Sequence, residues 1–207
     1  MTVGLVIVSH SAKLAAGVVE LAAQMAPGVP LLAAGGMADG GLGTDFDAVC
    51  TALADADLGA GVVLLFDLGS ARMTADLAVE MLDDPTRAVV AEAPLVEGAV
   101  AAAVAAAGGA DLSTVVAAAE AAGAAQPAVE PTAGPVASAD MVLANEVGLH
   151  ARPAAMLARS IAGLDAQVTV QLGDQRADAA SVLALLGLAA AKGAMWSASS
   201  STVLACW

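Results

Sequence analysis

Two histidines, His10 and His150, each lie where a strand or loop runs into the start of a predicted helix. Imidazole is a nucleophile when neutral near pH 7, and it becomes a good leaving group once it carries a phosphoryl group. Histidines in these places therefore suit reversible phosphoryl transfer. Taken alone, the Ser-His-Ser triplet around His10 is more often an ordinary surface or core histidine, so its predicted neighbours decide the interpretation.

His10 follows the apolar run of residues 3–8, which places it at the carboxyl end of a predicted strand, where open α/β sheets bind ligands. Two further loops are expected at the same edge: the glycine-rich residues 35–44, and residues 67–72, which enter a helix. Main-chain amides in such loops bind phosphoryl oxygens. The predicted phosphoryl-binding residues are Gly36, Gly43, Thr44, Gly69, Ser70 and Arg72.

Asp67 ends a predicted strand that is expected to lie beside the strand of His10. Its carboxylate would then accept a hydrogen bond from one ring nitrogen and leave the other nitrogen free to attack. The sequence does not choose between the two nitrogens. Arg72 is expected to offset phosphoryl charge. Asp67 alone could simply cap a helix, so the prediction rests on the three strand ends taken together.

His150 lies in the segment Gly-Leu-His-Ala-Arg-Pro-Ala, residues 148–154. Pro153 is tolerated only in the first turn of a helix, which leaves free amides near Ala151 and Arg152 beside the imidazole. The helix dipole disfavours an imidazolium there and favours an anionic adduct, and Arg152 supplies a fixed cation. His150 is therefore a second candidate for phosphorylation.

Strands and helices alternate over residues 1–123, which predicts an α/β domain with an open, mainly parallel sheet and helices on both faces. A proline-rich linker is expected at 124–139, followed by a small α+β domain at 140–207. The predicted strands are 3–8, 31–34, 62–66, 88–91, 141–144 and 166–172, and the predicted helices are 11–25, 46–56, 71–82, 96–107, 112–122, 152–162 and 181–191.

The net charge of −14, from 21 acidic and 7 basic residues, leaves little to make a nucleic-acid surface. The longest uncharged stretch in the first half, residues 21–38, contains prolines and glycines that a spanning helix would not carry. The first residues lack the pattern of a signal peptide. Cys50 and Cys206 have no nearby cysteine or histidine partners. We expect a cytoplasmic protein without disulfide, metal or bound cofactor.

The octapeptide GLHARPAA, residues 148–155, resembles the active-site signature of the HPr family of histidine phosphocarriers. This resemblance implies that His150 is phosphorylated and that Arg152 binds the phosphoryl group. The segment DAASVLALLGLAAAKG, residues 178–193, is similar to the HPr helix that docks on partners, and Ser181 then takes the place of a regulatory serine. An HPr domain continues past residue 193 with a fourth strand and a final helix, so the resemblance implies a C-terminally truncated domain here.

The segments LVIVSHS, AAGGMADGGLGTDFD, VLLFDLGSARM and PLVEGAV resemble the mannose-class enzyme IIA family of the phosphotransferase system. The form found in phosphoryl-donor subunits of dihydroxyacetone kinases is the most similar. The resemblance implies a homodimer and a phosphoryl route from phosphoenolpyruvate through enzyme I and HPr to His10. From there the phosphoryl group passes to ADP on the nucleotide-binding subunit of a kinase whose substrate-binding subunit holds dihydroxyacetone, which makes the chain part of a phosphoenolpyruvate–glycerone phosphotransferase.

Three alternatives stay open at this point. A sugar-transport enzyme IIA would pass its phosphoryl group to a IIB domain, and a regulatory module would have its phosphorylation state sensed by another protein. A flavodoxin-like domain that binds a small ligand would need no histidine.

Overall fold

The computed structural model describes residues 1–123, 136–144, 148–149, 151–161, 164, 166–188 and 190–201. The chain forms two compact units, Met1–Ala124 and Ala125–Trp207. Among the described residues no helix combines the length and the apolar character needed to cross a membrane.

A parallel sheet of four strands forms the centre of the first unit, in the order β2-β1-β3-β4. These strands are β1 (Gly4–Ser9), β2 (Leu31–Gly35), β3 (Val62–Phe66) and β4 (Ala88–Val90). In the register of this sheet Val8 pairs with Phe66 of β3, and Ser9 pairs with Gly35 of β2. The carboxyl ends of β1, β2 and β3 therefore meet at one edge, as the sequence predicted.

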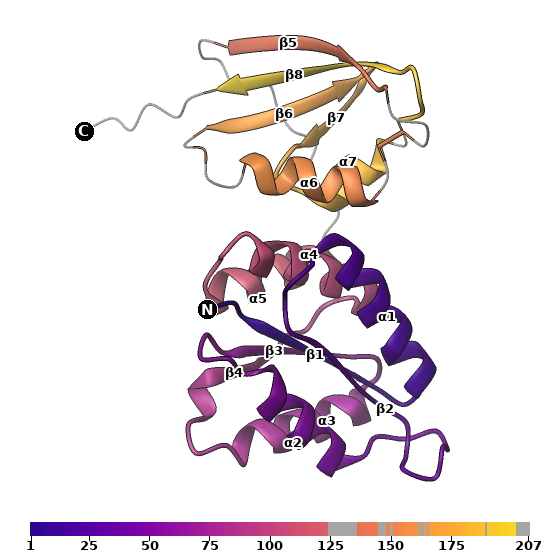
Figure 1. The fold of residues 1–207 in the computed structure, drawn as a ribbon, viewed down its shortest axis with the longest axis vertical. Coiled ribbons are helices and arrows are strands. Elements are labelled where there is room, and N and C mark those ends of the chain that lie inside the picture. The colour runs from indigo at the N-terminus through magenta and orange to yellow at the C-terminus, as the bar shows by residue number, and fades with distance from the viewer. Residues whose placement is uncertain are drawn as a thin grey trace, which may run out of the picture. The chain divides into compact units, whose positions relative to one another are not determined.

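Helices cover both faces of this sheet (Figure 1). The helices α1 (Ala12–Met25), α4 (Leu95–Ala107) and α5 (Leu112–Ala121) lie on one face, and α2 (Phe46–Ala56) and α3 (Gly69–Glu80) lie on the other. A short 3-10 turn, Pro85–Arg87, precedes β4. This arrangement confirms the predicted α/β class.

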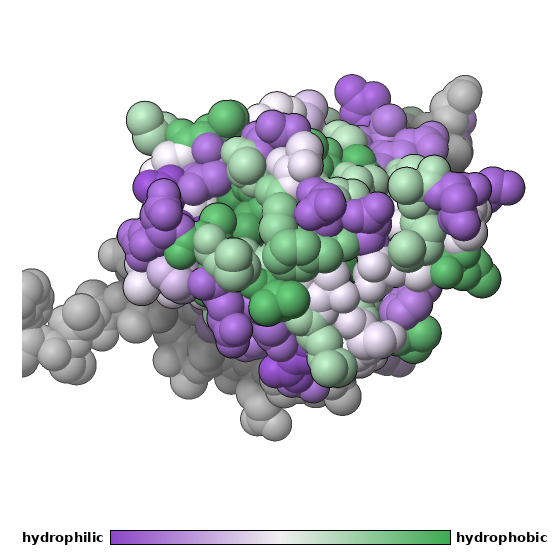
Figure 2. Space-filling view, turned by 90° about the horizontal axis from the view of Figure 1, so that it is seen from below, coloured by the Kyte–Doolittle hydropathy of each residue, from purple (hydrophilic) through white to green (hydrophobic). Residues whose placement is uncertain are grey.

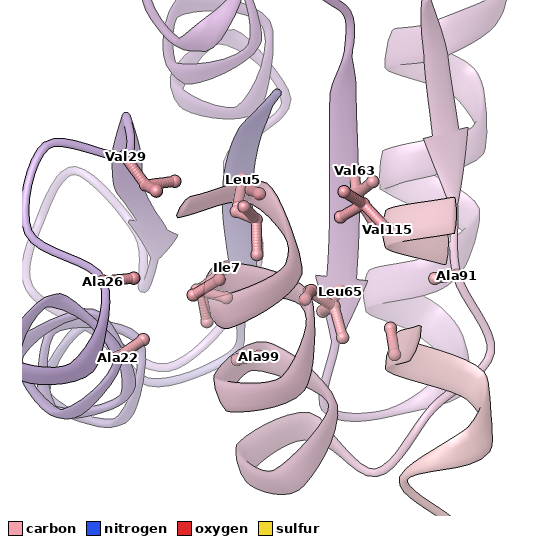
Figure 3. Close-up of a cluster of buried hydrophobic side chains, with 14 of the residues drawn as sticks. Leu5, Ile7, Ala22, Ala26, Val29, Val63, Leu65, Ala91, Ala99 and Val115 are labelled. Atoms are coloured by element: carbon pink, nitrogen blue, oxygen red, sulfur yellow. The ribbon is translucent and has the colours of Figure 1, made fainter. Parts of the chain in front are cut away.

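Side chains of β1 alternate between two apolar cores, because successive residues of a strand face opposite ways. Leu5 and Ile7 pack with α1, α4 and α5, and Figure 3 shows them among Ala22, Ala99 and Val115. On the opposite face, the core of α2 and α3 includes the neighbouring strand residues Val6 and Val8. Because β1 is buried on both faces, its end is a fixed support for His10, the residue that follows it.

Helix α3 begins at Gly69, two residues before the predicted start. Its N-cap residue, Leu68, makes no side-chain hydrogen bond to the first turn. By contrast, Ser11 caps α1 by accepting from the Leu14 amide, and Asp45 caps α2 by accepting from the Ala48 amide. The first turn of α3 thus lacks the polar cap that would have revealed its start in the sequence.

Hydrophobic surface crosses the centre of the view taken from the side of α2 and α3, with hydrophilic groups around it (Figure 2). The exposed apolar side chains here include Met73 and Leu77 on α3, and Met81 at its C-cap. Their spacing of four residues aligns them along one side of the helix.

The second unit contains an antiparallel sheet in the order β5-β8-β6-β7, with two helices on one face (Figure 1). Its strands are β5 (Val136–Val142), β6 (Gln167–Leu172), β7 (Gln175–Asp178) and β8 (Met195–Ser201), and its helices are α6 (Ala151–Ile161) and α7 (Val182–Gly187).

Several elements of this unit differ from prediction, and helix α7 ends at Gly187 although the predicted helix extended to residue 191. Strand β5 begins at Val136, inside the predicted linker, and the polar segments that form β7 and β8 were not predicted as strands. Pairing with neighbouring strands forms them in spite of their weak apolar alternation. Strand β8 supplies the fourth strand of the sheet, so the truncation expected after residue 193 does not remove it.

Candidate active site

His10 and Asp67 meet where β1 and β3 end. The His10 ring nitrogen Nδ1 lies 2.9 Å from Asp67 Oδ1, and the His10 main-chain amide donates to Asp67 Oδ2 at 2.8 Å. The His10 side chain is 26% exposed and that of Asp67 is 12% exposed. A largely buried carboxylate therefore orients an imidazole that remains open to solvent.

Four hydrogen bonds reach the Asp67 carboxylate, from the Ser9 hydroxyl, the His10 amide and ring, and the Leu68 amide. Burial opposes ionisation of this group, but the four hydrogen bonds outweigh it and lower the pKa of Asp67 below its ordinary value. Asp67 is thus an anion that acts as acceptor on both oxygens. His10 Nδ1 must then carry the hydrogen of this bond.

With the hydrogen on Nδ1, a neutral His10 ring has its lone pair on Nε2. Nε2 lies 2.8 Å from the hydroxyl oxygen of Ser70, which is exposed and donates in this tautomer. The geometry therefore makes Nε2 the nucleophilic nitrogen, which the sequence alone did not determine.

Ser70 belongs to the first turn of α3, and the amides of Gly69 and Ser70 have no hydrogen-bond acceptor within the described part of the chain. The positive end of a helix dipole and its unpaired amides form a site for an anion. Because the Ser70 hydroxyl contacts Nε2, a phosphoryl group on that nitrogen would lie beside these donors. Gly69 and Ser70 were both predicted for this role.

Gly36 and Gly43 contact the same region through their main chains. The Gly36 amide donates to the Ser9 carbonyl at 3.1 Å, and the Gly43 amide donates to the His10 carbonyl at 2.9 Å. Gly36 has φ +76°, and a Cβ there would press on Ala12 and on the Gly41 carbonyl. Since both amides already have acceptors, these glycines fix the loop against β1, and the structure differs here from the predicted donation to phosphoryl oxygens.

Thr44 joins the glycine-rich loop to α3. It forms a parallel bridge with Gly36, and its hydroxyl lies 3.0 Å from that of Thr74. The Thr74 hydroxyl also donates to the Ser70 carbonyl at 3.3 Å. Thr44 therefore supports the turn that carries Ser70, and Thr74 is a supporting residue that the sequence analysis missed.

Arg72 is occupied by groups other than His10. Its guanidinium donates to Glu92 Oε2 at 2.8 Å, lies 3.5 Å from Asp76 Oδ2, and stacks over the Phe66 ring. These two carboxylates offset its charge in this structure. A role for Arg72 as phosphoryl counter-ion stays a prediction.

His150 lies outside the described residues, so the geometry at its ring is not described. Arg152 is exposed in the first turn of α6, and Pro153 follows it, as the sequence predicted for this helix start. Ser181 caps α7, where its hydroxyl accepts from the Ala184 amide at 3.2 Å. The predicted roles of His150, Arg152 and Ser181 remain predictions.

Gly148 brings the start of the His150 segment against residue 190. It has φ +74°, and a Cβ at this position would overlap the Ala190 carbonyl oxygen. The neighbouring Leu149 is buried, and its amide donates to the same oxygen at 2.8 Å. Glycine is therefore required at this position for a structural reason.

Replacing Gly148 with alanine is expected to destabilise the second unit by about 2–4 kcal/mol, from backbone strain and overpacking together. Thermal unfolding of the full chain measures this loss. Gly173→Ala is the matched control, because Gly173 also has positive φ but a Cβ there meets nothing within 4 Å. Equal losses in the two variants would contradict the proposed overlap.

Comparison with known proteins decides the family of the first unit. Residues 4–116 match the EIIA-man family model, described as the PTS system fructose IIA component. The chain belongs to this family. A shorter stretch, residues 137–197, matches the PTS-HPr family model, described as the PTS HPr component phosphorylation site, and His150 falls within it.

Similar proteins include subunits of dihydroxyacetone kinases. The phosphotransferase subunit DhaM of a PTS-dependent dihydroxyacetone kinase from Lactococcus lactis is 41% identical over 110 residues, which cover 53% of this chain and 87% of the relative. The phosphoryl donor subunit DhaM of a PEP-dependent dihydroxyacetone kinase from Klebsiella michiganensis is 39% identical over 195 residues, covering 83% of this chain. The match covers only 41% of that longer relative.

The crystal structure of the unknown function protein EF1359 has the same fold as the EIIA-man unit. It is 34% identical, has a TM-score of 0.53, and the match covers 58% of this chain and 94% of that one. Together with the two family models, these relatives confirm the resemblance to a mannose-class IIA domain joined to an HPr-like region.

Ser9 is the residue of the EIIA-man site that sequence reasoning overlooked most clearly. Its hydroxyl contacts Asp67, yet a serine at the end of an apolar strand carries no signal of its own. The register between β1 and β3 would have revealed it, because Ser9 follows Val8 and Asp67 follows the paired Phe66.

Proposed function

We propose that this chain is a histidine phosphocarrier in which His10 relays a phosphoryl group to a dihydroxyacetone kinase. The observation that carries the proposal is the contact series from Asp67 through the His10 ring to Ser70. This series places the Nε2 nitrogen near the first turn of α3, where the Gly69 and Ser70 amides have no acceptor among the described residues. The similarity to phosphoryl donor subunits of PEP-dependent dihydroxyacetone kinases supports the proposed acceptor.

Uptake begins with attack of the Nε2 lone pair on the phosphorus of a phosphohistidine in an HPr-type donor, itself charged by enzyme I. The Nε2–P bond forms as the donor N–P bond breaks, and that electron pair returns to the donor ring. The His10 ring gains positive charge, which the Asp67 carboxylate stabilises through the Nδ1 hydrogen. The Ser70 hydroxyl and the amides of Gly69 and Ser70 bind the phosphoryl oxygens.

Release reverses these contacts. A β-phosphate oxygen of ADP on the nucleotide-binding subunit attacks the phosphorus, the Nε2–P bond breaks, and its electron pair returns to Nε2. The products are ATP and the starting tautomer of His10. The kinase then transfers the phosphoryl group from ATP to a hydroxyl of dihydroxyacetone. This step completes the overall reaction of a phosphoenolpyruvate–glycerone phosphotransferase. No step requires a metal or cofactor bound by this chain.

The proposed partners are enzyme I, HPr and both kinase subunits, with a second copy of the chain forming a homodimer. The exposed apolar side chains of Met73 and Leu77 on α3, and of Met81 at its C-cap, support self-association, because association would remove them from water.

Labelled phosphoenolpyruvate, enzyme I and HPr test this relay on the full chain. We expect label on the unit that contains His10, and we expect it to leave as ATP and then dihydroxyacetone phosphate when both kinase subunits, ADP and dihydroxyacetone are added. His150→Ala is expected to keep the label at His10, because added HPr supplies the phosphoryl group. Label that stays on the chain would contradict transfer and favour the regulatory alternative, whereas transfer only to a IIB domain would favour sugar transport.

A further inference from the structure

Ser9 is the one polar side chain found fully buried among the described residues. Its hydroxyl donates to Asp67 Oδ2 at 2.8 Å and accepts from the Ser11 amide at 3.0 Å. A buried hydroxyl whose donor and acceptor sides are both engaged has one fixed orientation. Ser9 therefore gives Asp67 a donor that does not rotate away.

The fold places Ser9 there through strand register. Val8 of β1 pairs with Phe66 of β3, so the next residues, Ser9 and Asp67, are lateral neighbours at the carboxyl edge. Ser9 shares the face of Leu5 and Ile7, which pack in the core of α1 and α4. Water is thereby kept from the hydroxyl, and a buried hydrogen bond is stronger than an exposed one.

The two oxygens of Asp67 have different partners. Oδ2 accepts from the Ser9 hydroxyl and the His10 amide, whereas Oδ1 accepts from His10 Nδ1 and the Leu68 amide. Both Oδ2 donors are held by the end of β1. They set the rotation of the carboxylate, and that rotation aims Oδ1 at the imidazole.

We propose that Ser9 is a positioning residue for phosphoryl transfer, which acts through Asp67 to hold the His10 ring with its lone pair on Nε2. This inference rests on the proposed function of His10, because the orientation has a kinetic effect only if Nε2 accepts the phosphoryl group. His10 is the titratable side chain that contacts Asp67 within the described part of the chain.

The test compares Ser9→Ala with Ser11→Ala. Ser11→Ala is the matched control. It removes a nearby serine hydroxyl that caps α1 by accepting from the Leu14 amide, and this hydroxyl does not contact Asp67. Ser9→Thr retains a hydroxyl. Ser9→Cys, which offers a weaker donor in a similar volume, replaces Ser9→Ala if the alanine variant does not fold. Three properties are measured: the carbon-13 titration of the Asp67 carboxyl, the nitrogen-15 shifts of the neutral His10 ring, and the rate of phosphoryl uptake from phospho-HPr.

For Ser9→Ala we expect an upward shift of the Asp67 titration midpoint, a larger Nε2–H fraction, and uptake slower by about tenfold to a hundredfold. Ser9→Thr should restore all three properties towards wild type. Ser11→Ala should lower only the melting temperature. An Asp67 titration and His10 tautomer unchanged in Ser9→Ala would overturn the inference. The carbon-13 and nitrogen-15 measurements need no phosphoryl donor, so they test the effect of Ser9 on Asp67 and His10 independently of transfer. A wild-type chain that accepts no phosphoryl group would instead defeat the proposed function.

Discussion

Replacing His10 with alanine is expected to abolish phosphoryl incorporation into the first unit, a loss of at least about a thousandfold. The variant keeps Asp67, Ser70 and the unpaired amides of α3 but lacks the nitrogen that attacks phosphorus. The remaining hydroxyl at this position, that of Ser70, is a weak nucleophile without an adjacent base. Labelling from phosphoenolpyruvate, enzyme I and HPr, followed by proteolysis between the two units, measures the effect.

His10→Ala also separates the two candidate sites. Label on the fragment that contains His150 should persist, because that histidine belongs to the other compact unit. Folding is checked by the thermal unfolding of the first unit, which should change little since the His10 side chain is partly exposed. Undiminished label on the first unit would show that another residue accepts the phosphoryl group and would defeat the proposal.

Replacing Asp67 with asparagine is expected to slow uptake by roughly ten-thousandfold, because the wrong tautomer of a catalytic histidine costs this order of rate. The Ser9 hydroxyl and the His10 amide both donate to Oδ2, so the asparagine oxygen is drawn to that position. Its amide group then faces His10 Nδ1 as a donor. The ring hydrogen moves to Nε2 and blocks the nucleophile. Stopped-flow uptake and nitrogen-15 shifts measure the two effects.

Asp57→Asn is the matched control for Asp67→Asn. Asp57 is also a carboxylate of lowered pKa, principally through its hydrogen bonds from Arg87, and it lies near the amino ends of the strands, where its side chain accepts from the Gly61 amide. The control should leave uptake unchanged. Equal losses of uptake in both variants would mean that the effect is general destabilisation.

Acid unfolding measures how much the ionised Asp67 carboxylate contributes to the stability of the folded chain. Its pKa is lower in the folded chain than in the unfolded chain, so the unfolded state binds protons first as pH falls. The stabilisation is complete above the ordinary carboxyl pKa of about 4 and is lost as pH falls through the lowered folded value. The stability of Asp67→Asn should therefore depend less steeply on pH in this acidic range than that of wild type.

Local pattern was sufficient for the elements that carry the site. Helix α2 and strand β3 have the bounds predicted for them, 46–56 and 62–66, because helical and extended periodicity are properties of a short window of sequence. Strand ends then placed His10, Asp67 and Ser70 at one edge, since parallel strands finish on the same side. The side-chain types at this edge then predicted the chemistry, because a histidine beside a carboxylate and small loop residues indicates phosphoryl transfer.

Only the tertiary structure decided which partners these groups have. The choice of Nε2, the attachment of Gly36 and Gly43 to the β1 backbone, and the pairing of Arg72 with Glu92 all depend on contacts between separate elements. Strand register and side-chain rotation set such contacts, and neither leaves a mark in a window of local sequence. The sequence by itself therefore predicted His10 as the phosphoryl carrier, and the packing of β1 against β3 decided which ring nitrogen contacts Asp67 and which faces Ser70.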